Sequence, residues 1–92
     1  MGKSKRYPEK HDINAIVILL ATQGMIHLAE IADPLTGQKV FNLEGAKFFI
    51  DLLAELKSKT QGNLKAEEIV FICDTLENLQ KIINKKTDTA NG

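Results

Sequence analysis

Ala15-Ile16-Val17-Ile18-Leu19-Leu20-Ala21 is a run of seven residues without a polar side-chain atom, and it lies within a helix-like segment spanning residues 12–31. An α-helix has about 3.6 residues per turn, so this run leaves no face of the helix for water. Such a helix must be covered, either by the rest of the fold or by a second copy of the chain. We favour the second copy, because a chain of 92 residues has few elements that can surround one helix.

Length and composition indicate a single-domain protein and exclude several functional classes. Ninety-two residues fit one domain, and 12 basic side chains balance 12 acidic ones, which argues against a nucleic-acid-binding protein. The single cysteine, Cys73, cannot form an intramolecular disulfide and is typical of a small buried apolar residue in a reducing compartment. Polar residues interrupt every apolar stretch before it reaches membrane-spanning length, and no cleavable targeting segment is evident. We therefore expect a cytoplasmic protein that does not enter the membrane.

The first helix is predicted to begin after the N-cap Asp12 and to run from Ile13 to about Ile31. Its N-terminal half is apolar all round, and its C-terminal half carries a polar strip. Gly24, inside the helix, costs about 1 kcal/mol relative to alanine. A close approach of another backbone, such as that of a symmetry-related copy, would explain this glycine.

A compact turn is predicted at Asp33-Pro34-Leu35-Thr36-Gly37, because proline disfavours helix at the residue before it and glycine accepts positive φ. Residues 38–41 are either a short strand or irregular. Asn42 is expected to cap a second helix from Leu43 to about Lys59, whose apolar residues recur with the three- and four-residue spacing of an amphipathic helix.

A second turn, containing Gly62, is predicted to separate the second helix from the third, and either Asn63 or Lys65 caps the third helix. This helix runs from Ala66 to about Lys85. Its apolar residues alternate spacings of three and four, as in a coiled coil. The predicted organisation is therefore a disordered basic arm (1–11), one helical domain (12–86) and a frayed tail (87–92).

Several segments of the chain resemble a bacterial family described as domain of unknown function 1844. The segments that carry the resemblance are residues 20–31, 33–37, 46–53 and 59–64. The D-P-x-T-G and K-T-x-G-N-L strings are the most specific, and the resemblance extends from about Asn14 to Leu79. Gly24 stands where the family is expected to have alanine, and Lys65-Ala66 stands in place of a Ser/Thr-Pro helix start. The resemblance implies a small helical bacterial protein and implies no activity, cofactor or catalytic residue.

Polar residues near the end of the first helix are the candidates for a chemical site. These residues are Gln23, His27, Glu30 and Asp33. Two or three of them could hold a divalent metal or share a proton, but a zinc site needs three or four ligands and the only other histidine, His11, lies in the basic arm. We find no catalytic constellation and expect no cofactor. A polar strip that bonds to the following turn or faces solvent is the simpler interpretation.

The sequence therefore predicts an all-α protein of three helices with two compact turns, completed by homodimerisation. Its predicted function is a homo-oligomeric protein–protein interaction module with an unidentified protein partner. The alternatives are a metal-dependent enzyme at His27 and Glu30, or a nucleic-acid-associated accessory protein that uses lysine and arginine residues near both ends of the chain (Lys3, Lys5, Arg6, Lys10, Lys81, Lys85 and Lys86). The predicted dimer interface consists of Ile16, Leu20, Gly24, Ile69, Ile72, Leu76, Leu79 and Ile83.

Overall fold

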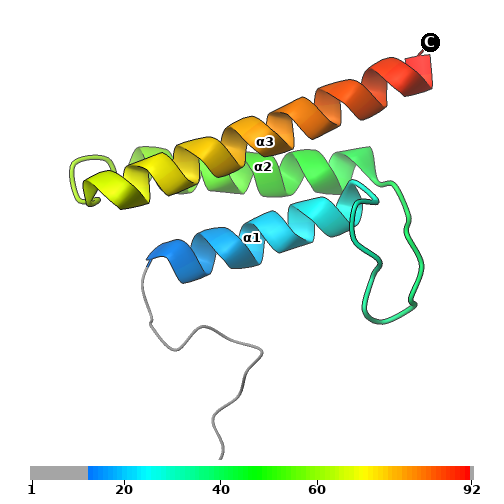
Figure 1. Ribbon diagram of the computed structural model, residues 1–92, viewed down its shortest axis with the longest axis horizontal. Helices are drawn as coiled ribbons and strands as arrows, with labels where there is room; N and C mark the ends of the chain where they lie inside the picture. The colour runs from blue at the N-terminus through cyan, green and yellow to red at the C-terminus, as the bar shows by residue number, and fades with distance from the viewer. Residues whose placement is uncertain (1–12, 92) are drawn as a thin grey trace, which may run out of the picture.

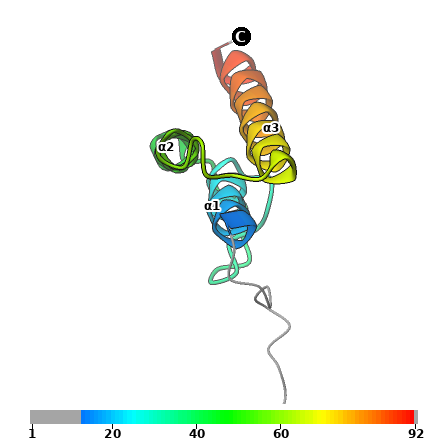
Figure 2. The same cartoon turned by 90° about the vertical axis from the view of Figure 1, so that its left-hand side faces the viewer.

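Three helices form the described part of the chain: α1 (Ile13–His27), α2 (Leu43–Lys59) and α3 (Ala66–Asn91). The structure is a computed structural model that describes the backbone of residues 13–91 and the side chains of residues 13–88. Figure 1 shows α2 running back along α1 and α3 returning in the direction of α1. Seen from the side in Figure 2, α1 lies below α2 and α3. No strand occurs in residues 13–91, and the predicted all-α, three-helix fold is confirmed.

The core lies where the three helices meet. α1 contributes Val17, and Leu28, just after this helix, is also fully buried. The other members of the core come from one face of α2 and one face of α3: Ala46, Ile50, Leu53, Ile72, Leu79 and Ile83. The coiled-coil-like row predicted on α3 thus packs largely inside the chain.

The end of α1 differs from the prediction, because the helix stops at His27 rather than near Ile31. Ala29 adopts a positive φ of 63°, its N–H donates to the Ile26 carbonyl at 3.0 Å, and the Glu30 N–H donates to the Met25 carbonyl at 2.9 Å. These two bonds form a Schellman motif, which usually has glycine at the position of Ala29. The sequence offered no glycine or proline there, so the apolar pattern predicted a longer helix.

The segment between α1 and α2 is held by a dense set of local hydrogen bonds. The Asp33 carboxylate accepts from the Leu35 N–H at 2.8 Å, and the Asp33 carbonyl accepts from the Gly37 N–H at 2.7 Å. Gly37 has the positive φ of 73° that this turn needs. Residues 38–41 form no strand; Phe41 makes only an isolated antiparallel bridge with Leu28. The predicted compact turn is therefore present.

Caps define the ends of α2 and α3. The Asn42 side chain accepts from the Gly45 N–H at 3.0 Å, as predicted for an N-cap. At the start of α3 the Lys65 N–H donates to the Glu68 carboxylate at 2.8 Å, which is one half of a capping box. α3 continues to Asn91 rather than ending near Lys85, and the Thr87 hydroxyl donates to the Ile83 carbonyl at 2.9 Å. The predicted basic arm (1–11) and Asp12, the predicted N-cap of the first helix, lie outside the described residues.

Two buried or half-buried helical glycines have opposite steric surroundings. A Cβ at Gly24 would lie 3.7 Å from the nearest Leu79 methyl carbon and 3.9 Å from Phe49 Cβ, which is ordinary contact. A Cβ at Gly45 would collide with the ring of His27, whose Nε2 would be 2.8 Å away. Only Gly45 is therefore required by a close approach, and its neighbour is a histidine of the same chain.

We expect Gly24→Ala to stabilise the protein by up to about 1 kcal/mol, because alanine has the higher helix propensity and fits. Gly45→Ala should destabilise it by about 1–3 kcal/mol through overpacking against His27. Thermal or urea unfolding of the two variants checks this pair. A destabilised Gly24→Ala would show that α1 and α3 lie closer together than described.

Candidate interaction surface

More large apolar side chains are exposed than are buried in the described part of the chain. Eight apolar residues form the core, whereas eleven large ones are exposed: Ile16, Ile18, Leu19, Ile31, Leu35, Val40, Phe41, Phe48, Leu52, Ile69 and Val70. Single exposed apolar residues are normal, but a contiguous group marks an interaction site.

One group of exposed apolar residues lies on α1. The buried residues of α1 are Val17 and Gly24. Because successive residues of a helix are about 100° apart, residues 19, 22 and 26 lie on roughly the opposite side of α1. Leu19 is 57% exposed and Ile18 is 46% exposed. The Thr22 hydroxyl donates to the Ile18 carbonyl at 2.7 Å, so this polar group is satisfied within the helix. No Asp, Glu, Lys or Arg occurs from Ile13 to His27. We call this side of α1 the outer face.

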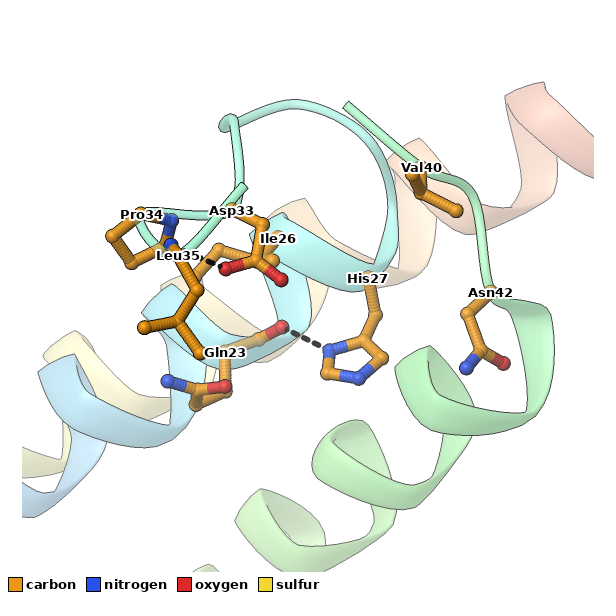
Figure 3. Close-up of a pocket in the computed structure, with 8 residues that line it drawn as sticks. All are labelled: Gln23, Ile26, His27, Asp33, Pro34, Leu35, Val40 and Asn42. Carbon is orange, nitrogen blue, oxygen red and sulfur yellow. Dashed lines mark hydrogen bonds between the residues drawn. The ribbon is translucent and has the colours of Figure 1, made fainter. Parts of the chain in front are cut away.

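A pocket of about 310 Å³ adjoins the C-terminal end of the outer face. Its walls come from the end of α1, the turn and the start of α2: Gln23, Ile26, His27, Asp33, Pro34, Leu35, Val40 and Asn42. Figure 3 shows the turn residues on one side, Asn42 on the other, and the His27 ring between them. The structure thus brings together three of the four predicted polar candidates, Gln23, His27 and Asp33.

The polar groups of this pocket serve mainly to hold the fold. His27 Nδ1 lies 2.8 Å from the Gln23 carbonyl and must donate to it, because a carbonyl oxygen only accepts. The His27 ring packs on Phe49, with 5.3 Å between ring centroids. The Asp33 carboxylate is engaged by the turn. The pocket therefore combines apolar side chains with polar groups that are mostly engaged within the fold, which suits an apolar side chain better than a reacting substrate.

Glu30, the fourth polar candidate, lies apart from this pocket and pairs with α3. Its carboxylate is 2.8 Å from Lys86 Nζ, which also donates to the Leu28 carbonyl at 2.6 Å. The hydrogen bond and charge of Lys86 hold the pKa of Glu30 below its ordinary value of 4.5. These two effects exceed the desolvation that raises this pKa, and the charges of Lys39 and Lys85 lower it slightly further. Lys86 thus ties the end of α1 to α3.

The predicted dimer-interface residues separate into three sets. Gly24, Ile72, Leu79 and Ile83 are buried within one chain, so they cannot also contact a second copy without opening the core. Leu20 and Leu76 pack partly against this core. Ile16 and Ile69 are exposed. The glycine and most of the α3 row therefore belong to the intramolecular contact.

The structure also bears on the chemical alternatives. Within residues 13–91, no three His, Cys, Asp or Glu side chains gather in a way that could hold a metal ion. Cys73 is half-buried and is not part of a disulfide. Of the lysines proposed as phosphate contacts, Lys86 is committed to Glu30 and Leu28, and those of residues 1–12 lie outside the described part.

Comparison with known proteins gives the family. Residues 10–82 match the family described as Domain of unknown function (DUF1844), and the chain belongs to it. A search of curated proteins and a search of solved structures each found no match to the chain. None of the helices in residues 13–91 is both long enough and apolar enough to cross a membrane.

Sequence reasoning missed several parts of this surface. The exposure of Leu35 could have been inferred, because a turn held by its own hydrogen bonds leaves its central side chain outside. The apolar run contains Leu19, but a run that is apolar all round does not indicate which side of the helix faces outward. The contact between Glu30 and Lys86 joins residues far apart in the chain, and no local pattern indicates it.

The Glu30–Lys86 pair predicts a pH dependence. Because the folded state lowers the pKa of Glu30, the pair stabilises the protein above the unfolded-state pKa of about 4.5, and this contribution is lost as pH falls through the lower folded-state pKa. Glu30→Gln should therefore be less stable than the wild type at pH 7, and the difference should shrink by pH 3. Urea unfolding at both values tests this; an equal difference at both would show that the pair contributes nothing.

Proposed function

We propose that this protein is a homo-oligomeric protein–protein interaction module whose self-association is formed by the outer faces of two α1 helices. The observation that carries the proposal is the exposure of Leu19 and Ile18 on a helix without any Asp, Glu, Lys or Arg. Figure 2 shows α2 and α3 on the other side of this helix. α2 and α3 therefore leave the outer face for another molecule to cover (Figure 2).

A second copy fits this face better than a charged partner does. Charged groups at an interface give steering and partner selection, and α1 has none to offer between Ile13 and His27. An isologous pairing needs only that the face complements itself. A nucleic-acid phosphate backbone would be recognised by lysine and arginine, which this face lacks.

Apolar surface elsewhere is available for a different protein. Val70 precedes the buried Ile72 by two residues, so it points away from the core of its own chain, and it is 58% exposed. An α1 pairing leaves this side of α3 accessible. The self-associating face and a partner-binding face can therefore coexist on one chain.

Leu19→Glu tests the proposal, with Val70→Glu as a control of nearly equal exposure on another helix. A carboxylate at residue 19 would lie in a desolvated contact and cost several kcal/mol, so we expect the variant to sediment as a monomer at concentrations where the wild type is a dimer. Val70→Glu should remain a dimer.

Circular dichroism of both variants accompanies the sedimentation measurement. Leu19 contributes little to the core, so a dissociated Leu19→Glu chain should keep most of its helical signal. If Leu19→Glu keeps the sedimentation coefficient and the melting temperature of the wild type, or if both variants dissociate equally, α1 is not the interface.

A further inference from the structure

The outer face of α1 contains a row of residues with heptad spacing. Ala15, Leu19, Thr22 and Ile26 follow one another at intervals of four, three and four. This is the spacing of a seam between two helices in a coiled coil. The row runs most of the length of α1, which is about 22 Å at 1.5 Å per residue.

Small and large side chains alternate along this row, and the alternation distinguishes two orientations. In a parallel pair each residue meets its own copy, so leucine faces leucine and alanine faces alanine. In an antiparallel pair centred between residues 19 and 22, Leu19 faces Thr22 of the second copy and Ala15 faces Ile26. Facing positions that combine one large and one small residue interdigitate best.

We propose, resting on the function proposed above, that two copies pair antiparallel along this row and that each copy completes the pocket of the other. The orientation also places the N-terminal end of one α1 beside the C-terminal end of the other, which the helix dipoles favour. The occupant of the outer face is thus a second copy of this chain.

The second half of the proposal concerns the pocket beside Ile26. When a two-fold axis relates two antiparallel helices, each flank of one helix lies beside the same flank of the other helix. Ile16 and Gln23 lie on one flank of α1. Ile16 of one copy lies at the level of Met25 of the other, within one turn of Gln23, and so reaches the pocket of that copy. Ile16 is 46% exposed, and Leu35 at the pocket edge is 92% exposed. Each side chain covers the other when the pair forms.

The size of the interface gives a second reason to include the pocket. A strip of helix of about 22 by 10 Å is roughly 220 Å² in projection, well below the approximately 800 Å² per partner of a typical stable interface. The turn that carries Leu35 lies beside the C-terminal end of α1 (Figure 1) and extends the contact. It is also rigid, because Asp33 bonds to the N–H groups of Leu35 and Gly37.

Cysteine cross-linking tests the orientation. In a Cys73→Ala background, which removes the native thiol, Ala15→Cys and Ile26→Cys are made separately, and one of them carries a tag that changes its size. A disulfide requires Cα atoms within about 7 Å. After the two proteins exchange subunits and are mildly oxidised, we expect a mixed-size cross-link and little cross-linking of either variant alone.

Each other outcome of this experiment has a distinct meaning. Efficient cross-linking of each variant with itself would show a parallel pair and overturn the proposed orientation. Dimeric mass with no cross-link at either site would place the interface away from this row. Monomeric mass of the unmodified wild type would instead refute the proposed function, so the two failures are distinguishable.

A double-mutant cycle tests the pocket. Ile16→Ala and Leu35→Ala should each raise the dimer dissociation constant by about tenfold, and the double variant by clearly less than a hundredfold, because the two residues share one contact. Val70→Ala, on α3, should leave the constant unchanged. An effect of the double variant equal to the product of the two single effects, or no effect from Leu35→Ala, would show that the second copy does not reach the pocket.

Discussion

One constraint underlies the whole structure: the N-terminal half of α1 is apolar on every side, and residues 13–91 bury only one of those sides. Val17 and Gly24 face α2 and α3, while Leu19 faces outward. Among the described residues, the three helices bury the inner side of α1 and leave its outer side exposed. The hydrophobic effect, which forms the core, therefore also favours association of a second molecule with this helix.

The remainder of the fold holds α1 in a fixed position. The close fit of His27 against Gly45 joins it to α2, and Lys86 joins the residues just after it to α3 by contacting Glu30 and Leu28. The hydrogen-bonded turn that follows carries Leu35 to the edge of the outer face. These contacts surround the C-terminal end of α1. Three of the four polar candidates, His27, Glu30 and Asp33, thus take part in anchoring the helix or the turn after it.

Local signals predicted most of the helical boundaries. Asn42 capped α2 as expected, and Gly37 and Gly62 both adopt positive φ in the two turns. The end of α1 could not be predicted, since Ala29 takes a conformation that normally calls for glycine. The packing partner of a helix face is not encoded locally: periodicity shows that Ile72, Leu79 and Ile83 share a face, but only the structure shows that this face is buried within the same chain.

The most direct test of the account is the absolute mass of the wild-type chain in solution, measured by light scattering over a wide range of concentrations. The account predicts twice the 10.2 kDa of one chain, with dissociation only on dilution. A mass of one chain at every concentration, with α1 still helical, would contradict it, because the outer face of α1 would then be stable in water without a second copy.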